Sequence, residues 1–498
     1  MFRQFSIYSV PFFPSAGHAF IIVSYIALNF VFLFGFLNNS NFGFVNNIAS
    51  RTGWLALANM LFSVFLALKN TPLAFLTAWS YERLNILHRY SGFFAVLHMI
   101  IHACSYSGYF LSLDEPELLT MESSIYGILA GSSFFLLGLS GIVLRPWWYE
   151  LFYYVHIVFF ILAVVMTGMH QPSIIDGFLV ITILTGSMWA LDRLVRFIRL
   201  VFYSFNNHVT LTPLPHGGTR VTLAKAPLGA LSGKHCFLWI PAIRSFETHP
   251  FTISAMNPLE FVVTAHDGFT KDLHELAASQ PGVEFGASVE GSYGTFPKPS
   301  RFDHVVLIAG GTGASFTFGA AFNALKQLNG RRETKIMFVW TVRHRSILSW
   351  YASHLETLSK DGRVSVHIFV TKGRDNSGSS EYPTRETGKG RMDDFAMSPS
   401  SSRANASSAS SMSGDAEKNI TTVVDFDMNS YSGIPITWKR PDVPGMIRGV
   451  VSGATRKQSV LVMGCGPSAL MKQVRNTTAA CIWSDGPSVE LHCEEFGW

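Results

Sequence analysis

The sequence predicts a membrane α-helical bundle of six spans, followed by an antiparallel β-barrel and a doubly wound α/β domain. Long apolar segments lie almost entirely before residue 202, and the chain is 48% hydrophobic but only 14% charged. Short alternating runs separated by Gly and Pro then indicate the strands of a small barrel. A later alternation of strands, a glycine-rich turn and helices indicates the α/β domain. The expected domains are residues 1–202, 203–300 and 301–498.

Composition narrows the function and the compartment. The net charge of +5 is modest, and no basic run interleaved with aromatics is present, so we expect no nucleic-acid partner. The five cysteines form no CxxC or zinc spacing, and this odd count favours a reduced compartment for the soluble half. The N-terminus has Arg3 but no small-residue cleavage site, so the first apolar run is expected to be retained as a span.

Six apolar segments are long enough to cross a bilayer, and the second is the shortest. They fall near residues 19–37, 54–69, 90–108, 124–144, 149–169 and 177–198. Loop charges set the expected orientation, because basic residues concentrate on the cytoplasmic side. The predicted inner side carries Lys69, Arg83, Arg89, Arg145, Arg193, Arg196 and Arg199. The predicted outer side carries Arg51, Asp114, Glu115, Glu117, Glu122 and Asp176. Both termini are therefore expected inside.

Four histidines form two equal intervals on two of these spans. His88 and His102 lie fourteen residues apart, as do His156 and His170. At about 1.5 Å per residue this interval spans ~21 Å and returns to within roughly 40° of the same helix face. The two spans run in the same direction, so we expect His88 opposite His156 on the inner side and His102 opposite His170 on the outer side. Two stacked bis-histidine sites suit b-type haem iron.

The alternative for a single intramembrane histidine is a proton relay or a hydrogen-bonded packing residue. Matched intervals on two spans favour haem ligation. His98 serves as the contrast, because the matching position on the other span is Met166, and we expect it to pack. Arg83 and Arg89 lie where inner-haem propionates should emerge, although interfacial anchoring explains them equally well.

Two segments of the predicted barrel indicate a flavin cradle. The His249-Pro-Phe-Thr-Ile-Ser stretch places Thr252 and Ser254 at strand spacing on one side. In His266-Asp-Gly-Phe-Thr, Gly268 allows close backbone approach, Thr270 can bind a phosphate, and a helix begins there. An ordinary strand edge is the alternative for the first segment alone. The candidate FAD-binding residues are His249, Pro250, Phe251, Thr252, Ser254, His266, Gly268 and Thr270.

A glycine turn follows the first strand of the α/β domain and opens a helix, as dinucleotide binding requires. Its candidate residues are Gly310, Gly311, Thr312 and Gly313. Arg343 and Arg345 follow the next strand, where a ribose 2′-phosphate would lie, which favours NADPH over NADH. Solvated surface arginines are the alternative.

A second glycine turn, Gly464-Cys-Gly-Pro, follows a later strand. Cys465 is a candidate catalytic residue that packs against the nicotinamide, flanked by Gly464, Gly466 and Pro467. A small buried residue is the alternative. The terminal Trp498 is expected to stack on the flavin ring, or otherwise to cap a core. Residues 373–435 include a Ser-rich tract and are expected to form a disordered insertion without a catalytic part.

These motifs, in this order, resemble the fungal ferric reductase branch of the transmembrane ferric reductase and NADPH oxidase superfamily. The resemblance covers nearly the whole chain and implies a ferredoxin-reductase-like module behind the membrane domain. It also implies two b haems, FAD and NADPH, a multi-pass plasma-membrane location, and cytoplasmic nucleotide domains. Many fungal members begin with a cleaved signal and a large extracellular domain, neither of which is recognisable in this chain.

The expected activity is therefore transmembrane electron transfer from NADPH to an acceptor outside. Chelated Fe(III) is the expected acceptor, and whether Cu(II) is also reduced remains open. The rival with the same cofactors is an oxidase that forms superoxide. A receptor or channel with a degenerate nucleotide domain is a more distant rival, which the intact motifs oppose. Membrane lipid is an expected partner, and an iron permease or oxidase partner and a homo-oligomer remain open.

Overall fold

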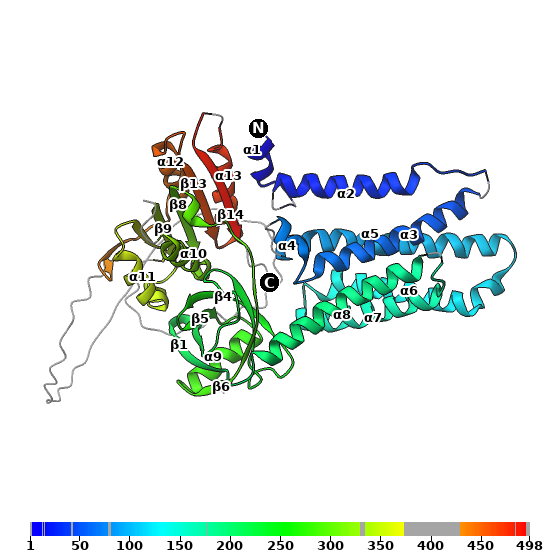
Figure 1. Cartoon of the computed structure of the whole chain (residues 1–498), viewed down its shortest axis with the longest axis horizontal. Helices are drawn as coiled ribbons and strands as arrows, with labels where there is room; N and C mark the ends of the chain where they lie inside the picture. The colour runs from blue at the N-terminus through cyan, green and yellow to red at the C-terminus, as the bar shows by residue number, and fades with distance from the viewer. Residues whose placement is uncertain are drawn as a thin grey trace, which may run out of the picture.

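The computed structural model describes residues 2–11, 13, 15–40, 43–77, 81–175, 177–328, 334–372, 429–483 and 485–494. Trp498, Asp176, the side chain of Arg83 and most of the expected insertion lie outside what it describes. An elongated helical bundle occupies one side of the molecule and two sheets occupy the other (Figure 1). The order of a helical bundle followed by an antiparallel sheet and a mostly parallel sheet is the predicted one.

In the part of the chain that the structure describes, six long helices form the bundle, together with short helices α1 and α4. Their bounds are α1 Phe2–Ile7, α2 Ala16–Phe34, α3 Phe44–Ala67, α4 Pro72–Thr77, α5 Tyr81–Ser112, α6 Glu122–Leu139, α7 Tyr149–His170 and α8 Phe178–Phe202. Among the described residues, five of these helices are long and apolar enough to cross a membrane, and α3 falls outside that group. The most extensive contact in the fold joins α3 to α5, so α3 belongs to the bundle.

The structure corrects the expected length of the second span. Helix α3 begins at Phe44, about ten residues before the predicted segment at 54–69. Asn46, Asn47 and Arg51 dilute the apolar pattern there without breaking the helix. The Arg51 guanidinium donates to the carbonyls of Phe32 and Phe36 at 3.1 and 2.9 Å, and also to Gly35, so its charge compensates the last turn of α2.

An antiparallel sheet in the order β6-β1-β2-β5-β4-β3-β7 forms the next domain. The strands are β1 His208–Leu214, β2 Gly218–Leu223, β3 His235–Trp239, β4 His249–Met256, β5 Leu259–Thr264, β6 Glu284–Gly286 and β7 Ser288–Tyr293. Its two outermost strands, β6 and β7, are separated by a single residue, so the sheet curls on itself as a barrel. Leu211, Leu238 and Phe261 fill the interior, and helix α9 (Phe269–Ser279) closes one end.

The last domain is a mostly parallel sheet in the order β11-β12-β10-β9-β8-β13-β14. Its strands are β8 His304–Gly310, β9 Lys335–Val342, β10 Val364–Val370, β11 Ser430–Tyr431, β12 Ile434–Thr437, β13 Ser459–Cys465 and β14 Ser488–Glu494. The helices are α10 Ala314–Gln327, α11 Ala352–Ser359, α12 Val443–Gly453 and α13 Ser468–Ala480. The prediction that the insertion extends to residue 435 was wrong at its end. Strand β11 and the start of β12 already belong to this sheet, in which Ile434 and Ile436 are buried.

Candidate functional site

The structure brings together the two histidine pairs that the intervals predicted. His88 of α5 faces His156 of α7 with 6.4 Å between ring centroids. His102 and His170, farther along the same two helices, are 6.3 Å apart. A metal–imidazole bond of about 2 Å on each side of one ion leaves two ring centroids roughly 6 Å apart. Both spacings therefore accommodate one metal ion with two axial imidazoles.

Each of the four imidazoles contacts a backbone carbonyl of a neighbouring helix through Nδ1. Because a carbonyl can only accept, Nδ1 carries the proton and donates, which leaves the lone pair on Nε2. Such an outer contact is what orients a metal-ligating histidine. The acceptors are Ser63 O for His88 (2.9 Å), Ala49 O for His102 (2.8 Å), Leu137 O for His156 (3.3 Å) and Ser123 O for His170 (2.7 Å).

Two glycines make room for the outer pair. Gly53 lies four residues after Ala49, and a Cβ there would be 2.8 Å from His102 Nδ1. Gly127 lies four residues after Ser123, and a Cβ there would be 2.8 Å from the His170 ring. An ordinary side chain at either position would push the imidazole away from its carbonyl. At the inner pair, serine hydroxyls add contacts instead.

His98 joins neither pair. It is 2% exposed, and its Nε2 lies 3.2 Å from Asn29 Oδ1 of α2. The Asn59 amide donates to the same Asn29 oxygen, and the Tyr25 hydroxyl donates to Asn59. His98 therefore lies in a polar contact between helices, consistent with the packing role expected for it.

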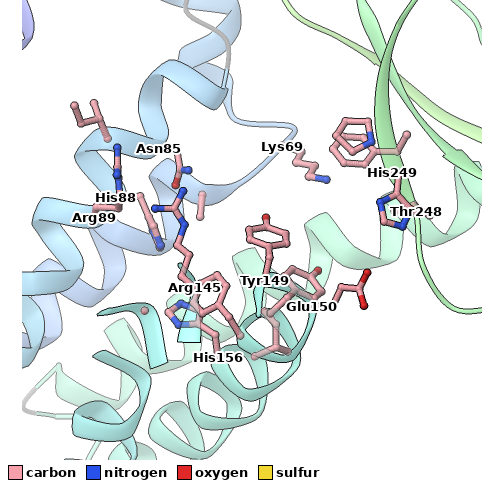
Figure 2. Close-up of a pocket in the computed structure, with 18 of the residues that line it drawn as sticks. Lys69, Asn85, His88, Arg89, Arg145, Tyr149, Glu150, His156, Thr248 and His249 are labelled. Carbon is pink, nitrogen blue, oxygen red and sulfur yellow. The ribbon is translucent and has the colours of Figure 1, made fainter. Parts of the chain in front are cut away.

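A cavity of about 2750 Å³ connects the inner histidine pair to both soluble domains. Figure 2 shows His88 and His156 at one end and Thr248 and His249 at the other. The cavity also reaches Thr312 of the first glycine turn. One continuous space thus adjoins the inner histidines, the predicted flavin cradle and the predicted nucleotide turn.

The membrane end of this cavity is basic. Lys69, Arg89 and Arg145 line it, and Figure 2 shows both arginines beside the inner histidines. Sequence reasoning counted Arg145 only as a loop charge. The signal that could have singled it out is its place at the end of the helical segment that supplies the Leu137 carbonyl, which accepts from His156 Nδ1.

Most of the predicted flavin residues adjoin this cavity, which is lined by His249, Pro250, Phe251, Thr252, His266 and Thr270. The His249 ring stacks on Phe269 at 4.1 Å, and burial lowers the His249 pKa although Glu247, at 3.2 Å, opposes the shift. The Thr270 hydroxyl accepts from the backbone N–H of His266 at 2.9 Å. Gly268 has φ +62°, a conformation that favours glycine.

Ser254 departs from the expectation. It is fully buried, and its hydroxyl donates to the Glu260 carbonyl of β5 at 2.9 Å. The register of β4 against β5 shifts between Ile253 and Ala255, so simple strand alternation fails at this residue. Thr252 and Ser254 therefore do not share a face toward the cavity.

The two glycine turns pack against each other at the carboxyl ends of adjacent parallel strands β8 and β13. A Cβ on Gly313 would lie 2.2 Å from the Cys465 carbonyl, and one on Gly310 would lie 2.8 Å from Pro467. A Cβ on Gly466 would lie 3.0 Å from the Gly310 nitrogen. Cys465 itself is 1% exposed and packs in the core, the arrangement of the small-residue alternative.

The two candidate arginines differ in their surroundings. Arg343 is exposed directly after β9. Arg345 donates to the Ser430 carbonyl at 3.0 Å and lies over the Tyr431 ring. Arg343 is therefore the better placed of the two to meet a ribose phosphate.

Family models match three consecutive parts of the chain. Residues 52–167 match the ferric reductase like transmembrane component, residues 207–304 an FAD-binding domain, and residues 302–479 the ferric reductase NAD binding domain. Solved structures align only loosely, as with the CS-b5R domains of human Ncb5or at 17% identity, 57% coverage of this chain and 68% of that one, and a TM-score of 0.36.

The curated relatives are fungal. The probable cell surface ferric reductase kap2 of Aspergillus oryzae is 27% identical over 72% of this chain and 52% of its own length. Ferric/cupric reductase transmembrane component 2 of Saccharomyces cerevisiae is 23% identical over 97% of this chain and 67% of its own. The chain thus spans about half to two thirds of these two proteins. It belongs to the ferric reductase family, with the transmembrane, FAD-binding and NAD-binding parts in that order.

Proposed function

We propose that this membrane protein carries electrons from cytosolic NADPH through FAD and two b-type haems to ferric chelates on the outer side of the plasma membrane. The observation that carries the proposal is the pair of facing histidine sets, each imidazole oriented by a backbone carbonyl. Relatives named ferric reductase and ferric/cupric reductase support the choice of acceptor, with Cu(II) as a second candidate.

The donor set fits haem iron. Four imidazoles offer Nε2 lone pairs in two facing pairs, and each pair would hold one haem iron. Arg89 and Arg145 at the inner pair supply the positive charge that propionates require. When bound, flavin accepts a hydride from NADPH and passes single electrons onward to haem iron.

The protein's own groups position these cofactors. We assign the flavin to the cavity beside His249 and Thr252, with its pyrophosphate at the start of α9 next to Thr270. The paired glycine turns leave open backbone for the dinucleotide, and Arg343 is the residue we assign to the 2′-phosphate. We propose that Trp498 stacks on the flavin ring and that Cys465, which is 1% exposed, supports the second glycine turn beside the nicotinamide.

Bis-histidine ligation leaves no open position on iron, so we expect the acceptor to react at the outer haem edge rather than to bind the metal. The rival acceptor is O₂, because the histidines and nucleotide motifs do not distinguish the two.

Reconstituted vesicles provide the test. Protein whose nucleotide domains face outward is given NADPH outside, with a ferric chelate and an Fe(II) indicator sealed inside. We expect Fe(II) to accumulate in the lumen, and to do so faster with NADPH than with NADH. Superoxide as the main lumenal product would establish the oxidase instead, and a folded preparation without flavin would reject both.

A further inference from the structure

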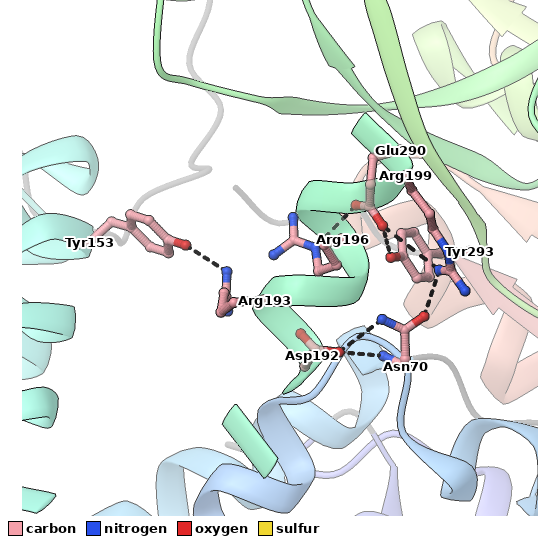
Figure 3. Close-up of polar contacts among 8 residues, drawn as sticks. All are labelled: Asn70, Tyr153, Asp192, Arg193, Arg196, Arg199, Glu290 and Tyr293. Atoms are coloured by element: carbon pink, nitrogen blue, oxygen red, sulfur yellow. Dashed lines mark hydrogen bonds and ion pairs between the residues drawn. The ribbon is translucent and has the colours of Figure 1, made fainter. Parts of the chain in front are cut away.

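A buried carboxylate joins the barrel to the membrane bundle. Glu290 lies on β7, and its side chain is 2% exposed. Its Oε2 accepts from Arg196 Nε at 3.1 Å, and Arg199 Nη1 lies 4.0 Å from its Oε1. Both arginines come from α8, the last helix of the bundle. Figure 3 shows Glu290 between them, with the Tyr293 hydroxyl donating to the same carboxylate.

The contact continues into a second part of the bundle. Arg199 donates to Asn70 Oδ1 at 2.7 Å, and the backbone and side-chain N–H groups of Asn70 donate to Asp192 Oδ1 at 3.0 and 2.9 Å. Asn70 follows α3, the helix whose Ser63 carbonyl holds His88. One network of charges and amides therefore links β7, α8 and the end of α3.

Two neighbouring contacts join the same surfaces. The Ser288 hydroxyl of β7 donates to the Leu200 carbonyl of α8 at 2.5 Å. The Lys69 ammonium lies 3.0 Å from the centroid of the Phe237 ring on β3, the strand beside β7. The strand opposite β7 across β3 is β4, which begins at His249 of the flavin cradle.

The electrostatics make Glu290 the critical member. It is one buried carboxylate facing two guanidinium groups, and removing a single partner from such a set leaves buried charge uncompensated. Asp192 is also buried, but it accepts from the neutral amide groups of Asn70, and Arg196 and Arg199 are more exposed than Glu290, at 11% and 40%. Loss of the Glu290 charge should therefore loosen the docking of the barrel more than loss of any other single group.

We propose that Glu290 is a positioning residue for electron transfer: it fixes the barrel on α8 and thereby sets the separation between the flavin cradle and the inner histidine pair. The inference rests on the proposed function. It predicts that one step, flavin to inner haem, depends on Glu290. The step from NADPH to flavin occurs between the two soluble domains and should not depend on it.

The test compares both steps in Glu290→Gln by anaerobic stopped-flow absorbance of the purified full-length protein. We expect flavin-to-haem transfer to slow by about tenfold or more, because a misplacement of about 1 Å in a reactive geometry can cost on the order of 100-fold. NADPH-to-flavin transfer should remain near the wild-type rate. Arg199→Gln, at a partly exposed arginine, should show the same selectivity with a smaller slowing and guards against misfolding of the first variant.

Glu260→Gln is the matched control. Glu260 also lies on a barrel strand and faces an arginine, Arg220, at 3.9 Å, but on the side of the nucleotide domain. We expect this variant to leave flavin-to-haem transfer unchanged. Two results would overturn the proposal. One is equal slowing of that step by Glu290→Gln and Glu260→Gln, and the other is no selective slowing in either of the docking variants, Glu290→Gln and Arg199→Gln.

A hydrogen-exchange arm separates this proposal from the proposed function. Glu290→Gln should raise amide exchange in residues 288–293 and 192–200, and Glu260→Gln should not. If wild-type protein never passes electrons from NADPH to haem, the proposed function fails while the exchange result still tests the docking role. Unchanged exchange in both docking variants would reject that role.

Discussion

The inner and outer histidine pairs have nearly the same spacing but different surroundings. Each imidazole of the inner pair also contacts a serine hydroxyl. Ser63 Oγ lies 2.9 Å from His88 Nδ1, and Ser140 Oγ lies 3.3 Å from His156 Nδ1. The inner pair also adjoins the large cavity and two arginines. Among the described residues, the outer imidazoles hydrogen-bond to backbone carbonyls and not to serine hydroxyls, and Gly53 and Gly127 leave space for their rings. Within the described residues, the cavity reaches only the inner pair.

This difference separates two structural tasks. At the inner pair, polar side chains and a cavity adjoin the imidazoles, and in the proposed function this is where electrons would arrive from the soluble domains. At the outer pair the helices approach the imidazoles so closely that the backbone at Gly53 and Gly127 packs directly against the rings. We therefore expect inner-site changes to alter rates and affinities, and outer-site changes to decide whether a haem fits at all.

The largest expected effect comes from removing one histidine of each pair. His102→Ala should eliminate the outer haem and abolish reduction of the outside acceptor, while NADPH still reduces flavin and the inner haem. His156→Ala should eliminate the inner haem and leave an outer haem that NADPH cannot reduce. Haem content and anaerobic absorbance spectra measure both. Loss of both haems in a folded His102→Ala protein would contradict the separate assignment.

The next largest effect is expected from Gly127→Ala. The added Cβ would lie 2.8 Å from the His170 ring, which must then leave the Ser123 carbonyl. Loss of an orienting contact of this kind weakens metal binding by about 10- to 100-fold. Titration of the purified protein with haem measures it, and we expect the inner site to bind normally.

Gly141→Ala is its control. Gly141 stands in the same relation to the Leu137 carbonyl, four residues later, but its nearest neighbour would be Phe152 at 4.0 Å, an ordinary contact. We expect both haems to be retained there. Similar haem loss in Gly127→Ala and Gly141→Ala would show that the space at Gly127 is not a specific requirement of the outer pair.

A smaller effect should follow from Ser140→Ala at the inner pair. The hydroxyl contact to His156 is lost, but the Leu137 carbonyl remains as an acceptor. Such a contact contributes about 1 kcal/mol, so we expect roughly fivefold weaker inner-haem binding. Ser133→Ala, whose hydroxyl donates to Leu129 on the same helix, should leave binding unchanged. An equal loss in both variants would point to helix stability instead.

The smallest effect concerns a buried histidine of the soluble half that we do not assign to iron. Burial lowers the pKa of His354 from 6.5 to about 4. The folded state then binds fewer protons than the unfolded state between these values, so stability is fully present above pH 6.5 and falls as the pH drops toward 4. At pH 5.5 the loss is about 1 kcal/mol relative to pH 8.

His354→Leu should remove this slope. Thermal unfolding of the full-length protein, followed by release of flavin fluorescence across this pH range, measures it. A slope that is unchanged in the variant would assign the acid sensitivity to another group.

The histidine pairs were predictable because helix periodicity is rigid, so fourteen residues place His88 and His102 on one face whatever surrounds them. Their carbonyl partners were not predictable, since Ala49 and Ser123 come from other helices and meet the imidazoles only through tertiary packing. Strand alternation predicted Thr252 and Ser254 on one side, and this was wrong at Ser254, where the register shifts. Glu290 gave no signal, because a single acid within a short strand is normally a solvated residue.

The most direct test of the account is the haem content and ligation of the purified full-length protein, measured by haem extraction and low-temperature electron paramagnetic resonance. Facing imidazoles oriented by backbone carbonyls predict two low-spin, six-coordinate b haems per chain, one lost with His156→Ala and the other with His102→Ala. A folded, flavin-containing protein without haem, or with high-spin haem that survives both substitutions, would contradict the central claim.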